Sequence, residues 1–295
     1  MLLSKVISYV MAGALVLASN LSQAQENFLK ETHERQLKLA QILGKKELSD
    51  KSKADILIMQ AASLDSLERS QEALPLVEQA LRIATPEQQA SFTVTKATIF
   101  FTQGRVADAL ALLAPLLDSE RQAAAAAKPD ERAGRLAVHQ SGFILAAFSS
   151  VELGDWKNAL AYLADTEFTS DEPEFAEYRA VVYRYIMARA NDASLANANL
   201  EKQAVHIEKN SKSHYGALLR MWQGANNLTE LSRLIARKDA EEQQDAFAES
   251  LFYIGAYTKY VKRDPSLALN SLQQLNRISP YGSLEWVHGK RVLAL

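Results

Sequence analysis

The sequence has no cysteine, and glycine and proline are scarce, at 11 and 7 among 295 residues. Without thiols the chain can form no disulfide framework, no thiolate nucleophile and no zinc site built from cysteine. Residues that break helices are therefore few, while alanine, leucine, glutamate, glutamine, lysine and arginine are abundant. This composition favours a backbone that is nearly all α-helix.

Two further patterns are missing, and each excludes a class of protein. No run of alternating β-branched residues is long enough for a sheet, and no Asn-Gly or Asp-Gly turn joins such runs. A basic excess is also lacking, because 33 lysines and arginines face 35 acidic residues, for a net charge of −2. Nucleic-acid-binding domains usually carry such an excess, so we expect no nucleic-acid partner.

The N-terminus has the pattern of a signal peptide. Lys5 precedes an apolar run, Val6 to Ala18, and the small residues Ser22 and Ala24 follow it. As a helix this run would be roughly 20 Å long, too short for a bilayer core of about 30 Å. We therefore predict a signal peptide over residues 1–24 that is cleaved after Ala24; the alternatives are an uncleaved anchor or a buried helix.

This leader predicts the compartment. The mature chain is expected in the periplasm or the secreted fraction, and the absence of cysteine excludes a lipid-modified cysteine after the leader. No later segment approaches the 18 apolar residues of a transmembrane helix. We therefore expect a water-soluble mature protein.

Four segments of the mature chain share a pattern of large and small residues on two successive amphipathic helices joined by a tight turn. The matching residues are Leu57, Ala61, Leu64, Ala73, Val77, Ala80 and Pro86, then Ala97, Phe100, Gly104, Ala109, Leu113 and Leu116, then Phe143, Ala147, Gly154, Trp156, Ala159 and Leu163, then Phe252, Ala256, Ala268, Leu272, Leu275 and Pro280. This pattern resembles the tetratricopeptide-repeat (TPR) family. The resemblance implies an all-α, right-handed α-solenoid of stacked helix pairs with capping helices at both ends.

The spacing of the small residues supports the resemblance. Ala73 and Ala109 are 36 residues apart, close to the family period of about 34. Ala109 and Ala159 are 50 apart, and the excess falls in Gln122 to Gly134, which we interpret as a lengthened helix and a loop. The 109 residues from Ala159 to Ala268 correspond to three periods, so two degenerate units are expected between them.

The spacing predicts one TPR-like domain over residues 25–295. Its units are expected near 54–87, 90–122 and 140–170, with two degenerate units within 175–242, a last unit over 249–280, an N-terminal capping helix over 27–43 and a C-terminal cap over 281–295. Capping helices are needed because an array leaves apolar faces open at its ends. The pattern departs from the family at Ser150 and Lys259, where the family has an aromatic residue.

Catalytic and metal-binding patterns are not found, and we predict no enzyme activity, no metal site and no cofactor. The five histidines form no His-x-x-x-His or His-Glu-x-x-His pair. Glu249 and Ser250 resemble the Glu-Ser pair of soluble lytic transglycosylases, but only 45 residues follow, too few for that catalytic domain. We interpret Glu249 as a solvated residue near the N-terminus of a helix, where a carboxylate favours the dipole.

Three tyrosines form the candidate binding surface. Tyr253, Tyr257 and Tyr260 are spaced by four and three residues, so they share one helix face. In the TPR arrangement this face lines the concave groove, and tyrosine offers apolar area with a polar tip. The alternative is that the three side chains pack against the preceding helix inside the array.

Charge is a second candidate. The segment from Asp165 to Glu177 has six acidic and no basic residues, whereas the C-terminal end is mildly basic. The basic residues are Lys259, Lys262, Arg263, Lys290 and Arg291. Separate charges could orient a partner, although a solvated loop is the alternative for the acidic segment.

The expected function is that of an exported, non-catalytic scaffold or adaptor. It would bind a protein or peptide partner in the bacterial cell envelope, as a monomer or homodimer. Two alternatives remain open: the helical domain of a peptidoglycan-processing, lytic transglycosylase-like enzyme system, or a solenoid that binds carbohydrate or another small ligand.

Overall fold

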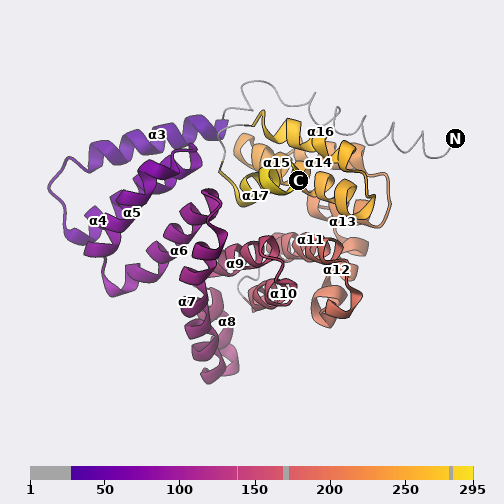
Figure 1. The fold of residues 1–295 in the computed structure, drawn as a ribbon, viewed down its shortest axis with the longest axis horizontal. Coiled ribbons are helices and arrows are strands. Elements are labelled where there is room, and N and C mark those ends of the chain that lie inside the picture. Colours follow the sequence, from indigo (N-terminus) through magenta and orange to yellow (C-terminus); the bar gives the residue numbers. More distant parts are fainter. Residues whose placement is uncertain (1–27, 138, 169–172, 279–281, 295) are drawn as a thin grey trace. The chain divides into compact units, whose positions relative to one another are not determined.

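The computed structural model describes residues 28–137, 139–168, 173–278 and 282–294, so the predicted leader and its cleavage point lie outside the described residues. The described part confirms the all-α class: 82% of it is helix, no strand occurs in it, and its 15 α-helices pack in adjacent pairs (Figure 1). In these ranges no helix combines the length and the apolar character needed to cross a membrane.

The chain divides into two compact units. The N-terminal unit is Lys30–Asp171, and the C-terminal unit is Glu172–Leu295 together with Phe28 and Leu29. The helices are α3 (Phe28–Leu43), α4 (Asp50–Ser66), α5 (Ser70–Ile83), α6 (Pro86–Thr102), α7 (Val106–Ala126), α8 (Pro129–Ala137), α9 (Gln140–Glu152), α10 (Trp156–Asp165), α11 (Pro173–Ala190), α12 (Ala198–Asn210), α13 (His214–Trp222), α14 (Leu228–Ile235), α15 (Ala240–Ala256), α16 (Pro265–Leu275) and α17 (Leu284–Val292). The short helices are η1 (Thr166–Phe168), η2 (Ala193–Leu195) and the π-helix η3 (Tyr257–Val261).

Each pair of helices in the N-terminal unit packs on the next. Helix α4 pairs with α5, α6 with α7 and α9 with α10, while α5 contacts α6 and α7 contacts α9. The small residues of the predicted pattern lie fully buried in these pairs: Ala61, Ala73, Ala97, Ala109, Ala147 and Ala159. Because the side chain of alanine is small, helix backbones can approach closely at these points.

A residue with a left-handed backbone ends the first helix of every pair. The six residues are Glu68, Gly104, Gly154, Asn191, Gly224 and Arg263, which are 36, 50, 37, 33 and 39 residues apart in turn. In four of these turns the next residue donates its backbone N–H to the carbonyl five positions earlier, at 2.8–3.0 Å, as in Arg69 to Leu64 and Arg105 to Phe100. This bond satisfies a helix-end carbonyl and turns the chain back for the second helix.

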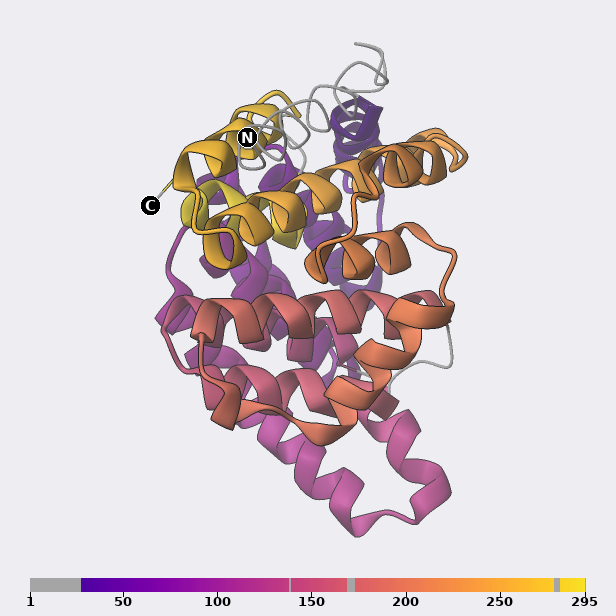
Figure 2. The same cartoon turned by 90° about the vertical axis from the view of Figure 1, so that its right-hand side faces the viewer.

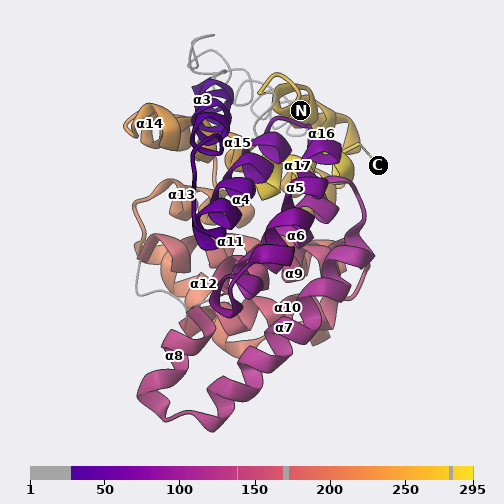
Figure 3. The same cartoon turned by 90° about the vertical axis from the view of Figure 1, so that its left-hand side faces the viewer.

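The longest of these intervals contains a helical hairpin. Helix α7 runs for 21 residues to Ala126, and α8 follows from Pro129. Figures 2 and 3 show α7 and α8 extending together beyond the other helices of the N-terminal unit. The lengthened helix was predicted from the alanine-rich run, whereas the expected loop contains α8, because Pro129 is a favoured residue at the first position of a helix.

In the C-terminal unit, α11 pairs with α12, α13 with α14 and α15 with α16, and α17 packs on α15 and α16. Glycine allows the closest approach. A Cβ atom at Gly255 of α15 would lie 2.7 Å from Leu293, which follows α17. A Cβ atom at Gly289 of α17 would lie 3.0 Å from Phe252. These two helices therefore position the aromatic interior of the unit.

Overpacking one helix pair tests the requirement for small residues. We expect Ala109→Leu to lower the free energy of unfolding by about 1–3 kcal/mol, because the added methyl groups enter a filled helix crossing. Ala107→Leu makes the same change two residues away on the exposed face of α7 and should cost under about 0.5 kcal/mol. Urea unfolding of both variants measures the difference, and equal midpoints would contradict close packing at Ala109.

Candidate functional site: a buried carboxyl and tyrosine cluster

The C-terminal unit buries two glutamates, Glu249 of α15 and Glu285 in the first turn of α17, which are 8% and 3% exposed. Carboxyl groups are almost never buried without partners, and here the partners are tyrosines. The hydroxyl of Tyr215 donates to Glu249 Oε2 at 2.6 Å. The hydroxyls of Tyr178 and Tyr253 both donate to Glu285 Oε1, at 2.7 and 3.0 Å. We call these five residues the carboxyl–tyrosine cluster.

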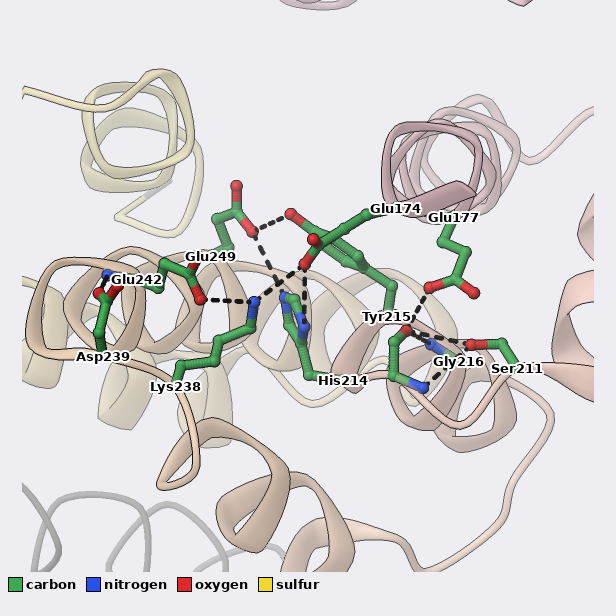
Figure 4. Close-up of polar contacts among 11 residues, drawn as sticks. Glu174, Glu177, Ser211, His214, Tyr215, Gly216, Lys238, Asp239, Glu242 and Glu249 are labelled. Carbon is green, nitrogen blue, oxygen red and sulfur yellow. Dashed lines mark hydrogen bonds and ion pairs between the residues drawn. The ribbon is translucent and has the colours of Figure 1, made fainter. Parts of the chain in front are cut away.

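His214, the first residue of α13, lies between this cluster and the surface. Its ring packs on that of Tyr215, with 3.9 Å between the ring centroids. Nε2 is 3.9 Å from Glu249 Oε2, and Nδ1 is 4.0 Å from Glu174 Oε1 (Figure 4). Both distances are too long for hydrogen bonds. The imidazole is therefore buried between two carboxyl groups without a hydrogen bond to either.

Ion pairs close the cluster at the surface. Lys238 Nζ lies 2.9 Å from Glu174 Oε1 and 3.4 Å from Glu242 Oε2 (Figure 4). Ser213, the residue before His214, caps α13. Its hydroxyl accepts the backbone N–H of Gly216 and donates to the carboxylate of Glu177. A polar path thus runs from the exposed Glu174 and the half-buried Lys238, past His214, to the buried Glu249.

Burial determines the protonation states of the carboxyl groups and the imidazole in this region. It raises the pKa of Glu249 to about 8, and the nearby negative charge of Asp245 adds to the rise. Burial also raises the pKa of Glu285 to about 8, with a further contribution from the charge of Glu249. It lowers the pKa of His214 to about 4, helped by the positive charge of Lys238. Near neutral pH the interior therefore holds two protonated carboxyl groups and a neutral imidazole.

This arrangement can store protons and fix helix positions. Tyrosine hydroxyls from α11, α13 and α15 bind carboxyl groups on α15 and α17, so the cluster joins four helices by hydrogen bonds. A neutral carboxyl group accomplishes this without the large cost of a buried charge. Across the described ranges, no group of three histidine, aspartate or glutamate side chains could hold a metal ion.

The predicted binding tyrosines lie at different depths. Tyr253 and Tyr257 are buried, and the ring of Tyr257 packs on Trp222 with 5.8 Å between centroids. Tyr260 is half-buried, 6.2 Å from the ring of Tyr185. Packing inside the array, the alternative left open by the sequence, thus describes the first two tyrosines. A binding role for the three stays a prediction, and only Tyr260 offers its ring to the surface.

The interpretation of Glu249 as a solvated residue near a helix N-terminus is wrong. Helix α15 begins at Ala240, so Glu249 lies in its middle and faces the interior. One signal could have revealed this: the helix is apolar on all sides around Glu249, as expected of a buried helix. Its hydrogen-bond partner Tyr215 comes from α13, and the other members of the cluster come from α11, α15 and α17, with no sequence spacing that connects them.

The two charged regions differ in structure. Within the predicted acidic segment, Asp165 pairs with Arg121 in the N-terminal unit, and Glu174 pairs with Lys238 in the C-terminal unit. Residues 169–172 lie outside the described residues. Two of the six carboxylates are therefore held in ion pairs of the fold, whereas the lysines of the basic end lie over aromatic rings: Lys259 over Tyr260, Lys262 over Tyr257 and Lys290 over Trp286.

No protein-family model matches the sequence, and a search of curated proteins also gives no match. The proposals below therefore depend on the geometry of the chain itself.

The buried carboxyl groups make stability depend on pH. The pKa of each carboxyl group is near 8 in the folded state and 4.5 in the free side chain. At a pH between these two values, unfolding therefore releases a proton from each group. Stability should therefore fall as pH rises towards 8, by at most about 4 kcal/mol between pH 6.5 and 8 for Glu249 and Glu285 together. His214 has the opposite effect, because its lowered pKa makes stability rise with pH, but only between about pH 4 and 6.5.

Urea unfolding at pH 6.5, 7.25 and 8, followed by the fluorescence of Trp222 and Trp286 in a Trp156→Phe background, reports on the C-terminal unit alone. The double variant Glu249→Gln with Glu285→Gln should lose most of the dependence on pH, because glutamine stays neutral at every pH. Glu241→Gln, an exposed change on the same helix, should retain it. A wild-type stability that does not change over this range would contradict protonated buried glutamates.

Proposed function

We propose that the mature chain is an exported, right-handed, TPR-like α-solenoid that binds a protein or peptide partner in the cell envelope and catalyses no reaction itself. The observation that carries the proposal is the recurrence of a left-handed residue at the end of the first helix of six successive pairs. Five intervals of 33 to 50 residues separate them, four of which lie within five residues of the TPR period of about 34.

A second feature supports the repeat. The same backbone hydrogen bond closes the turns at Glu68, Gly104, Gly154 and Gly224, although only three of these residues are glycines. The turn at Gly224 falls in the region predicted to hold two degenerate units. Structure is thus repeated where the sequence pattern is not, as expected of an array in which each unit packs only on its neighbours.

Partner binding follows from this architecture. Stacked helix pairs present one helix of each pair along a continuous surface, which suits an extended segment of another protein better than a small substrate. The predicted signal peptide over 1–24 places that partner in the cell envelope. Partner identity then depends on the side chains of the surface rather than on the fold.

Cross-linking in cells tests this function. The full-length chain with a C-terminal tag should appear in the periplasmic fraction with Gln25 as its first residue, as measured by mass spectrometry. Treatment of intact cells with a short cross-linker should join it to the same envelope proteins in repeated experiments. A version that starts at Gln25 after an initiator methionine should stay in the cytoplasm and yield none of them. Equal yields from both versions would contradict the proposal.

An enzyme of peptidoglycan processing is the second candidate, because Glu249 is protonated near neutral pH and a general acid needs such a pKa. Its burial beneath His214 and Tyr215 argues for the structural role. We expect neither the mature protein nor Glu249→Gln to release soluble fragments from purified cell wall. Release by the wild type that Glu249→Gln abolishes, with unchanged helical circular dichroism, would establish the enzyme instead.

A further inference from the structure

Basic residues gather at Tyr260 and at the turn that follows it in the C-terminal unit, where Lys262 Nζ lies 5.3 Å from the centre of the Tyr257 ring. Arg189 Cζ and Lys259 Nζ each lie 5.7 Å from the centre of the Tyr260 ring. Lys262 and Arg263 follow on the exposed turn after η3, and beside them Val261 is 41% exposed. We call these six residues, Arg189, Lys259, Tyr260, Val261, Lys262 and Arg263, the Tyr260 surface.

An irregular turn builds this surface. The π-helix η3 continues α15, and the turn is one residue longer than the four turns at Glu68, Gly104, Gly154 and Gly224: Asp264 N donates to Thr258 O, six positions back. Arg263 adopts the left-handed conformation at a φ of 58°, where glycine would be free of strain. Its guanidinium donates to Asn191 Oδ1 at 3.3 Å. π-Helical turns are rare and frequently occur at functional sites.

The surface concentrates positive charge in a chain whose net charge is −2. Within the described ranges no carboxylate forms an ion pair with Lys259, Lys262 or Arg263. Two nearby carboxylates, Asp192 and Asp264, cap the backbones of η2 and α16, so the four cations of the surface still outnumber the negative charges beside them. Such an excess attracts anions from solution.

Arg189 and Lys259 both lie against the ring of Tyr260. Lys259 Nζ donates to Val292 O at 2.7 Å, at the C-terminal end of α17, which fixes the side chain there. Burial lowers the pKa of Lys259, and the charge of Arg189 lowers it further. Placing like charges together is unfavourable, and a bound carboxylate would relieve that cost.

We propose that the Tyr260 surface binds an acidic segment of a protein partner. This proposal rests on the proposed function and assigns one contact surface and its chemistry. A peptide fits because the surface combines cations with the ring of Tyr260 and the exposed Val261, so that carboxylates and apolar side chains of one segment find matching contacts.

The test measures binding of a fluorescein-labelled peptide of three Glu-Glu-Leu repeats by fluorescence anisotropy at low salt. The mature protein should bind it and not a Gln-Gln-Leu peptide. The triple variant Lys259→Gln, Lys262→Gln and Arg263→Gln should bind about 10-fold more weakly, because the charges at the contact are lost. The matched control Lys202→Gln, Lys209→Gln and Lys212→Gln removes the same charge from the exposed side of α12 and its end, and should change binding less than about 2-fold.

Lys262→Glu, a single change at an exposed residue, should weaken binding about 3-fold or more even if the triple variant folds poorly. If peptide binding is weakened equally in both triple variants, the loss comes from the change in net charge and not from this surface, and the proposal is overturned. So would binding of a heparin fragment or of phosphatidylglycerol vesicles that is tighter than that of the peptide and is lost in the first triple variant.

Cross-linking in cells separates failure of this surface from failure of the proposed function. If the first triple variant captures the same envelope proteins as the wild type in equal yield, partner binding stands and the Tyr260 surface is not where it occurs. If the wild type captures none, the scaffold function itself fails.

Discussion

The fold depends on one backbone constraint, the left-handed residue that ends the first helix of each pair. An L-residue in this conformation costs roughly 1 kcal/mol compared with glycine, yet Glu68, Asn191 and Arg263 adopt it. The packing of the returning helix must offset that cost, together with a following backbone hydrogen bond after Glu68 and after Arg263. Each turn fixes the direction of a second helix, and within each of the two units that second helix forms part of the surface on which the next pair packs. The hairpin of α7 and α8 is accommodated because it extends one such helix without changing its turn.

The carboxyl–tyrosine cluster joins helices that are distant in sequence. Apolar side chains alone fit together in several ways, whereas a hydrogen bond between Tyr178 and Glu285 requires one relative position of α11 and α17. Burial keeps the carboxyl proton in place and so removes the charge that would otherwise make this interior unstable. The Tyr260 surface shows the opposite arrangement, since its basic residues gather at the surface, where Lys262 and Arg263 are exposed.

Much of the fold could be predicted from local residues. Ala73, Ala109 and Ala159 revealed the spacing, because a helix crossing restricts the size of a side chain. The turns at Glu68, Asn191 and Arg263 were harder to predict, because their conformation is imposed by tertiary packing and not by residue preference. The site was predicted least well: the helical spacing of Tyr253, Tyr257 and Tyr260 identifies a shared face but not its neighbours. Glu249 was misread because its partners, Tyr215 and His214, lie on another helix, α13.

The protonated glutamates couple folding to the composition of the surrounding solution. At neutral pH an unfolded chain has lost both protons, so folding of the C-terminal unit takes up about two from the medium. Under the proposed export, those protons would come from the compartment in which the chain folds and not from the one in which it was made. The heat measured for folding then includes the ionisation heat of whichever buffer supplies them.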